Sequence, residues 1–224
     1  MARRVAGRPP RRGEDGHAVP EADPGLEATR LLASRGVVVG LGHSRCTYEE
    51  ALAAADAGAT VVTHAFDAMG PLHHRAPGLV GAALEDERLV PTLIGDLAHV
   101  HPAVIRLVAA AKARVALVSD AVATAGLVAR DGAAFLPDGS LAGSATPLGV
   151  ALGRVAAAGI PLARAVEMAS TVPAGVLDLA DRGHLAVGAR ADVVGLDPAT
   201  LAVRAVWLRG ERVARAPVEE RGDG

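Results

Sequence analysis

The chain has 224 residues, of which 50% are hydrophobic and 2% aromatic, so its size suits one domain with a core of small aliphatic side chains. The formal net charge of −2 excludes a general electrostatic attraction to nucleic acid or to an anionic membrane. The single cysteine excludes an intramolecular disulfide and a cysteine-based zinc cluster.

The first part of the chain has no apolar periodicity. Residues 1–23 combine arginine, proline, glycine and acidic residues, which predicts a disordered or poorly docked tail, and residues 216–224 are predicted to be a second flexible tail. The N-terminal arginines are not interleaved with aromatic residues, so nucleic-acid binding is not expected. No apolar run approaches the roughly 20 residues that span a bilayer, which predicts a cytoplasmic protein without membrane contact.

From residue 24 onward, apolar strands alternate with alanine-rich helices. A capping box at Thr47 and Glu50 and a proline in the first turn, Pro102, mark two of the helix starts. Helices are predicted over 25–36, 47–59, 79–86 and 101–113, and strands over 37–44, 60–66, 89–96 and 114–120. Nearly continuous apolar strands that are separated by helices indicate a parallel sheet with helices on at least one face.

The pattern changes after residue 130. Residues 133–143 resemble a β-hairpin, two helices are predicted over 147–159 and 161–170, and residues 184–213 read as short strands joined by tight turns. We therefore predict an α/β domain over residues 24–180 and part of a small β domain over residues 181–215.

Polar side chains follow each of the four predicted parallel strands. These residues are His43, His64, Asp96 with His99 shortly after it, and Asp120. The carboxyl ends of parallel strands meet at one edge of the sheet, where ligands bind in α/β folds. Two imidazoles and a carboxylate are suitable ligands for zinc or a similar divalent ion, and a second carboxylate is a suitable general base.

Other catalytic motifs do not compete with this interpretation. The sequence has no phosphate-binding loop, no dinucleotide fingerprint and no nucleophile elbow. Cys46 and His43 are close enough in sequence to form a nucleophile pair, although a structural thiol is the favoured reading of Cys46. His73 and His74 lie in a loop rich in proline and glycine and are expected to face solvent.

Four motifs resemble the C-terminal part of the N-acetylglucosamine-6-phosphate deacetylase family of the amidohydrolase superfamily. They are "GHSRCTYEEALAAADAGATVVTHAFDAMGPLHHRAPGLVGAAL" (42–84), "GDLAHV" (95–100), "LVSDAVATAG" (117–126) and "LAGSATPL" (141–148). The resemblance implies the C-terminal half of a TIM (β/α)8 barrel, about four βα units, together with part of a small β-sandwich domain. It also implies deacetylation of an amino-sugar phosphate and, for a complete protein, a homodimer.

The resemblance further implies roles for individual residues. His43 and His64 are similar to the metal ligands, with zinc expected and iron, cobalt or manganese possible. Asp120 resembles the catalytic acid/base, and His99 resembles the histidine that polarises the acetyl carbonyl. The positions similar to substrate-binding residues are Asp67, Ala68, Arg75, His99, Leu141, Ala142 and Gly143.

Two departures from the family pattern leave alternatives open. The family usually has asparagine where Asp67 stands, and a carboxylate about 4 Å from a phosphate dianion would repel it by about 1–4 kcal/mol. The family's glutamate ligand in an "EGP" segment has no counterpart here, since Glu21 lies in a stretch that resembles a later part of the family. The chain is therefore interpreted as N-terminally truncated, with only four barrel strands. The two outer strands of such a piece have unpaired backbone groups that another segment would have to cover.

Two alternatives to this function remain open. The first is an amidohydrolase that acts on another amide substrate, and the second is a non-catalytic remnant whose exposed edge strands pair with another chain.

Overall fold

The computed structural model describes residues 19–122 and 127–215. The tails that we predict over 1–18 and 216–224 lie outside the described residues. Part of the predicted N-terminal tail is nevertheless ordered against the domain, because η1 (Pro20–Ala22) is a short 3-10 helix. The carboxylate of Glu21 accepts hydrogen bonds from Ser44 Oγ (2.5 Å) and from the Arg45 amide (2.9 Å). This segment therefore docks on the domain, because the buried Ser44 hydroxyl needs a hydrogen-bond partner and Glu21 supplies it.

A four-stranded parallel sheet is the centre of the fold, as expected. Its strands lie in the order β1 (Val39–Leu41), β2 (Ala59–Val62), β3 (Val90–Ile94) and β4 (Ala116–Val118). All three neighbouring pairs are parallel. Each strand is shorter than predicted, because the chain leaves the sheet into a loop at the carboxyl end of each strand.

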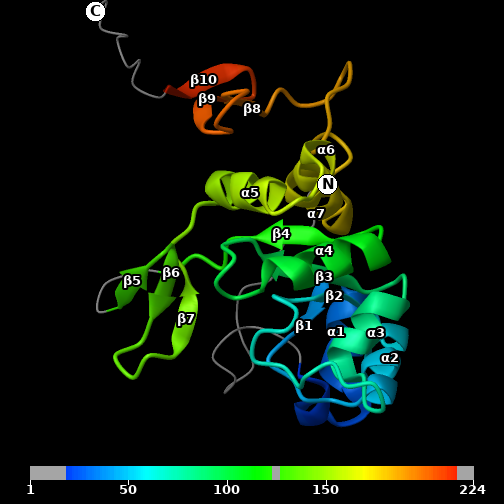
Figure 1. Cartoon of the computed structure of the whole chain (residues 1–224). Coiled ribbons are helices and arrows are strands. Elements are labelled where there is room, and N and C mark those ends of the chain that lie inside the picture. Colours follow the sequence, from blue (N-terminus) through cyan, green and yellow to red (C-terminus); the bar gives the residue numbers. More distant parts are fainter. Residues whose placement is uncertain (1–18, 123–126, 216–224) are drawn as a thin grey trace, which may run out of the picture.

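Helices alternate with the strands along the chain and pack against the sheet (Figure 1). After η2 (Pro24–Leu26), the helices of this part are α1 (Glu27–Ser34), α2 (Tyr48–Asp56), α3 (Gly78–Glu85) and α4 (Pro102–Ala111). The predicted capping box is confirmed, because Thr47 Oγ1 accepts from the Glu50 amide and the Glu50 carboxylate accepts from the Thr47 amide. Pro102 occupies the first turn of α4, as expected.

The second half of the chain forms two small antiparallel sheets and a helical segment (Figure 1). The predicted hairpin is part of a three-stranded sheet of β5 (Val128–Arg130), β6 (Ala133–Phe135) and β7 (Leu141–Ser144). The helical segment consists of α5 (Leu148–Ala157), α6 (Leu162–Val166), the π-helical turn η3 (Glu167–Thr171) and α7 (Val172–Val176). The last sheet contains β8 (Val193–Leu196), β9 (Val203–Leu208) and β10 (Glu211–Arg215).

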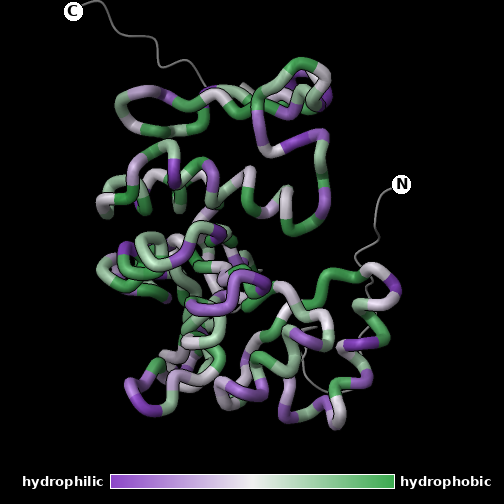
Figure 2. The backbone as a smooth tube through the Cα atoms, turned by 90° about the vertical axis from the view of Figure 1, so that its right-hand side faces the viewer, coloured by the Kyte–Doolittle hydropathy of each residue, from purple (hydrophilic) through white to green (hydrophobic). Residues whose placement is uncertain are grey.

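Both views of the molecule place the β8–β10 sheet at one end, next to the helical segment (Figures 1 and 2). Hydrophobic and hydrophilic stretches alternate along the tube in Figure 2, as expected for elements with one buried face. None of the helices in the described part of the chain has the length and apolar character needed to cross a membrane.

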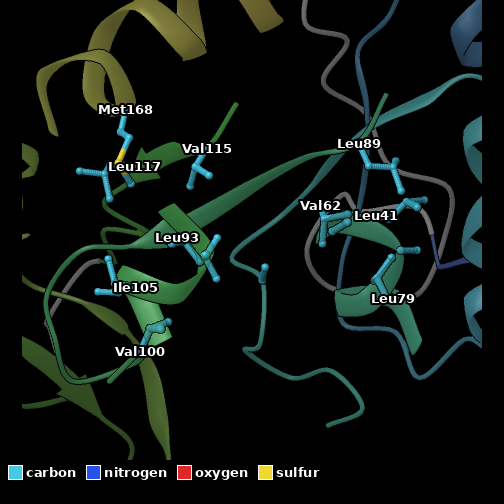
Figure 3. Close-up of a cluster of buried hydrophobic side chains, with 14 of the residues drawn as sticks. Leu41, Val62, Leu79, Leu89, Leu93, Val100, Ile105, Val115, Leu117 and Met168 are labelled. Atoms are coloured by element: carbon cyan, nitrogen blue, oxygen red, sulfur yellow. The ribbon is translucent and has the colours of Figure 1, made fainter. Parts of the chain in front are cut away.

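The hydrophobic core lies along the parallel sheet (Figure 3). In one part of it, Leu41 and Val62 from neighbouring strands lie close to Leu79 of α3. In another part, Met168 of η3 reaches toward Leu117 of β4, and both side chains are almost fully buried. This packing holds the strands rigidly and so positions the loops that follow them.

The fold buries a positively charged side chain. Lys112, the only lysine of the chain, follows α4 and is 1% exposed. Its Nζ donates a hydrogen bond to the Asp86 carbonyl (2.6 Å) and lies 3.6 Å from Glu87 Oε1. A buried ammonium is tolerated only when hydrogen bonds and a counter-charge compensate for its lost hydration, so Lys112 ties the end of α4 to the turn before β3.

We expect Lys112→Met to lower the free energy of unfolding by about 1–3 kcal/mol, because the Asp86 carbonyl loses its buried donor. Urea unfolding monitored by circular dichroism measures the change. Arg114→Met, an exposed cation nearby, is the control and should change stability by less than about 0.5 kcal/mol. Equal losses in the two variants would contradict a role for the buried hydrogen bond.

Candidate active site

Four polar residues occupy the same position relative to the four parallel strands. The strands end at Leu41, Val62, Ile94 and Val118. Two residues later in each case stands a side chain that can bind a ligand or a proton: His43, His64, Asp96 and Asp120. Because neighbouring strands are parallel, these residues gather at one edge of the sheet. The predicted clustering at the strand ends agrees with this geometry.

The backbone at this edge is left-handed at several residues other than glycine. His43 has φ 49°, His64 has φ 33° and Asp120 has φ 48°. Three nearby loop residues share positive φ values: Phe66, Ala68 and Leu97. Such conformations cost about 1–3 kcal/mol each and concentrate where function requires them. The strain therefore points to the same edge as the polar side chains.

The rings of His43 and His64 lie close together, tilted by 35°, just beyond the ends of β1 and β2. Their ring centroids are 4.7 Å apart, and His64 is 4% exposed whereas His43 is open to solvent. The His64 amide donates to Thr92 Oγ1 (2.7 Å), which fixes the left-handed turn against β3. Imidazoles are ligands that zinc prefers, so this pair fits a divalent metal as two of its ligands.

The pair does not complete a metal site by itself. Within residues 19–122 and 127–215, the structure contains no group of three or more His, Cys, Asp or Glu side chains placed to hold a metal. Zinc sites in proteins use about three or four protein ligands.

Asp96 and His99 form a buried pair at the end of β3. His99 Nδ1 lies 2.8 Å from Asp96 Oδ2, with side-chain exposures of 4% and 0%. Burial alone would raise the pKa of Asp96, but hydrogen bonds from the His99 ring and from the His99 and Ala98 amides lower the pKa to about 2. Burial opposes protonation of His99, whereas Asp96, together with the charges of Asp67 and Asp120, raises the His99 pKa overall.

Asp67, in the loop after β2, has an unusual environment. Its Oδ2 atom is buried and has no hydrogen-bond partner in the structure, and its amide donates to the His64 carbonyl (3.0 Å). Burial and the negative charges of Asp96 and Asp120 raise the pKa of Asp67 to about 7, against the opposing influence of His99. Asp67 is thus electrostatically coupled to the strand-end residues.

The β5–β7 sheet contacts Asp120 through β7. The Ser144 amide donates to the Asp120 carbonyl (2.9 Å), and the Val122 amide donates to the Ser144 carbonyl (3.2 Å). Gly143 has φ 102°, and a Cβ added there would lie 2.8 Å from the Asp120 carbonyl oxygen. Only glycine allows this close approach. The structure therefore brings Gly143 to Asp120, and it places Leu141 and Ala142 on the same strand.

The remaining predicted substrate-binding residues lie in the loop after β2. Ala68 and Arg75 are exposed, and the Arg75 guanidinium contacts His74 Nε2 (2.7 Å) within its own loop. The structure brings Arg75 into no hydrogen bond or ion pair with the strand-end residues that it describes. The phosphate-binding role of Arg75 stays a prediction. His73 and His74 are exposed as expected, and Cys46 is a buried free thiol.

Sequence reasoning missed Arg154, which connects the strand edge to the β5–β7 sheet. Its Nη1 donates to the Asp96 carbonyl (2.9 Å) and to the Asp131 carbonyl (2.8 Å) and lies 3.3 Å from Thr146 Oγ1. The signal in the sequence is a lone arginine within the apolar helix α5. A charge at such a position calls for buried partners.

A cavity of about 370 Å³ lies at the opposite edge of the sheet, where the strands begin. Its lining residues are Ala33, Gly36, Val37, Val38, Gly58, Thr60, Arg88, Arg114, Gly175 and Val176. Arg88 is held there by ion pairs with Asp86 and Asp56. This cavity is separate from the candidate site.

We expect Gly143→Ala to displace Asp120, because the new methyl group meets the Asp120 backbone and alanine disfavours the left-handed conformation. The free energy of unfolding should fall by about 1–3 kcal/mol, as measured by urea unfolding. Gly139→Ala is the matched control, since Gly139 also has positive φ but nothing within 4 Å of an added Cβ. A loss no larger than that of Gly139→Ala would show that the contact with Asp120 does not matter.

A comparison with protein-family models matches residues 27–216 to the "Amidohydrolase family". Among curated proteins, the chain is 39% identical to the N-acetylgalactosamine-6-phosphate deacetylase of Escherichia coli O157:H7, over 86% of this chain and 55% of that protein. It is 38% identical to the N-acetylglucosamine-6-phosphate deacetylase of Rattus norvegicus, over 91% of this chain and 54% of that protein. The chain thus spans about half the length of the curated relatives it matches.

Solved structures give the same result. The structure matches a mutant of N-acetyl-D-glucosamine-6-phosphate deacetylase from Mycobacterium smegmatis, in complex with N-acetyl-D-glucosamine-6-phosphate, with a TM-score of 0.81 and 38% identity. That match covers 88% of this chain and 56% of the other. The N-acetylglucosamine-6-phosphate deacetylase of Thermotoga maritima matches with a TM-score of 0.80 and 31% identity, over 88% of this chain and 58% of the other.

Proposed function

The chain belongs to the amidohydrolase family, and from this premise we propose that the protein carrying it deacetylates N-acetylglucosamine 6-phosphate to glucosamine 6-phosphate and acetate. The observation that carries the proposal is the gathering of His43, His64, Asp96 and Asp120 at one offset beyond four parallel strands. The names of the relatives supply the substrate class, which includes the 4-epimeric N-acetylgalactosamine 6-phosphate. Small-molecule amino-sugar phosphates are thus the proposed partners.

The proposed architecture is the C-terminal half of a TIM barrel with part of a small β-sandwich domain. Support comes from the four parallel strands, which alternate with helices and present their polar residues at one edge. The β8–β10 sheet is the proposed portion of the sandwich. The strands β1 and β4 would pair with further barrel strands, because a closed barrel leaves no edge strand.

A divalent metal, with zinc as the first choice, is proposed as the cofactor. His43 and His64 would provide two of its ligands through their imidazole nitrogens. When bound, such a metal supplies Lewis-acid chemistry that activates water and polarises a carbonyl.

The residues of the chain account for the proton transfers of amide hydrolysis. The exposed carboxylate of Asp120 accepts a proton from the attacking water as the new C–O bond forms, then delivers it to the nitrogen as the C–N bond breaks. Protonated His99 donates a hydrogen bond from Nε2 to the acetyl oxygen, where negative charge develops. The backbone of Leu141, Ala142 and Gly143 would cover the sugar, and Arg75 would bind the phosphate with its guanidinium fork.

We expect the natural gene product that contains this chain, loaded with zinc, to release acetate from N-acetylglucosamine 6-phosphate. Asp120→Asn should reduce kcat by about 100-fold or more, because the asparagine amide cannot accept the proton. Enzymatic detection of acetate measures the rate. Asp138→Asn, in the turn between β6 and β7, is the matched control and should retain activity. An inactive zinc-loaded protein, or full activity of Asp120→Asn, would contradict the proposal.

Asp67 favours a second candidate, an amidohydrolase for a different amide substrate. If the phosphate of the substrate lies near Asp67, Asp67→Asn should lower KM for the phosphorylated sugar about fivefold, since about 1 kcal/mol of repulsion is removed. KM for unphosphorylated N-acetylglucosamine should not change. Steady-state kinetics with both sugars measures the difference. Faster turnover of the unphosphorylated sugar by the wild-type protein would support the second candidate.

A homodimer and a cytoplasmic location stay predictions.

A further inference from the structure

We propose that Asp96 is the positioning residue of His99, because its carboxylate holds the Nδ1–H of the imidazole and leaves Nε2 as the nitrogen that can meet a substrate. The proposal deepens the proposed function, on which the reaction role of His99 rests. The geometry itself is independent of that function. Both side chains are buried, and the two atoms are 2.8 Å apart.

The two carboxylate oxygens of Asp96 accept hydrogen bonds from different groups. Oδ1 accepts hydrogen bonds from the backbone amides of Ala98 (2.9 Å) and His99 (3.1 Å), which shapes the turn after β3. This turn accounts for one oxygen and leaves Oδ2 directed at His99 Nδ1. An aspartate that served only to shape the turn would not need a second oxygen in contact with the ring.

Asp96 is also held rigidly from its backbone. Arg154 Nη1 donates to the Asp96 carbonyl (2.9 Å) and to the Asp131 carbonyl in the turn between β5 and β6 (2.8 Å). Asp96 therefore stands at the junction of the strand edge and the β5–β7 sheet. A carboxylate anchored in this way can orient an imidazole, as second-shell partners do for functional histidines.

The direction of the hydrogen bond is determined by chemistry. An ionised carboxylate has only acceptor atoms, so the proton between the two groups belongs to His99 Nδ1. The charged groups that raise the pKa of His99 are Asp96 in its own loop, Asp67 from the loop after β2 and Asp120 after β4. All three carry negative charge when ionised, so they favour the imidazolium form. In that form Nε2 also carries a proton and can donate a hydrogen bond to an acetyl oxygen.

The variant Asp96→Asn tests the proposal sharply. The backbone amides of Ala98 and His99 would still donate hydrogen bonds to the side-chain carbonyl oxygen of the new asparagine. Its NH2 group would therefore face His99 Nδ1. A donor at that place turns Nδ1 into an acceptor. The neutral ring should therefore change from the Nδ1–H tautomer to the Nε2–H tautomer, and its pKa should fall.

Nitrogen-15 NMR of the 224-residue chain measures this change directly. The chain has eight histidines, and the signal that disappears in His99→Gln identifies His99. The expected result is the Nδ1–H tautomer at high pH in the wild-type chain and the Nε2–H tautomer in Asp96→Asn. If the variant does not fold, the wild-type spectrum alone decides the matter, because an Nε2–H tautomer there overturns the proposal. The same tautomer in both folded proteins also overturns it.

Kinetics of the natural gene product supply the second readout. Asp96→Asn should lower kcat for acetate release by about 10- to 100-fold, since the ring loses its charge. In the His99→Gln background, the same change should alter kcat less than about twofold, because the imidazole through which Asp96 acts is absent. An equal loss in both backgrounds would mean that Asp96 acts only on the fold. If the tautomer inverts but no protein releases acetate, the proposed function fails and the positioning role stands.

Discussion

Parallel pairing of β1 to β4 is the constraint on which the rest of the structure depends. Parallel strands place every carboxyl end on one edge, and each strand here ends two residues before a polar side chain. The hydrophobic core beneath holds the strands in register, since a slip of one residue would turn buried side chains to the other face. Packing of small aliphatic residues thus determines where the imidazoles and carboxylates stand.

Much of this arrangement follows from the sequence. Continuous apolar runs separated by helices imply parallel neighbours, and neighbouring strands imply that His43 and His64 lie close together, as their 4.7 Å ring separation confirms. The capping box of Thr47 and Glu50 likewise needs only local information. These inferences succeed because periodicity and local hydrogen bonding act within a few residues of each position.

Other features depend on contacts between distant segments and were beyond sequence reasoning. The hydrogen bond between Glu21 and Ser44 joins residues that lie far apart in the chain, and the sequence around Glu21 does not predict it. The contacts of Arg154 with two carbonyl oxygens have the same character. A sequence pattern also cannot show that one oxygen of Asp96 shapes a turn while the other contacts His99. Such details are set by tertiary geometry, in which the functional precision of a site resides.

The buried Lys112 gives the molecule an unusual chemical property. It is the only lysine of the chain, and its side chain is inaccessible in the folded state. Amine-selective acylating reagents would therefore find no side chain to modify on the native protein, and proteases that cut after lysine would find no site. Both reactions would begin only when the end of α4 opens. The rate of modification or cleavage at Lys112 would therefore measure how often this part of the native structure opens.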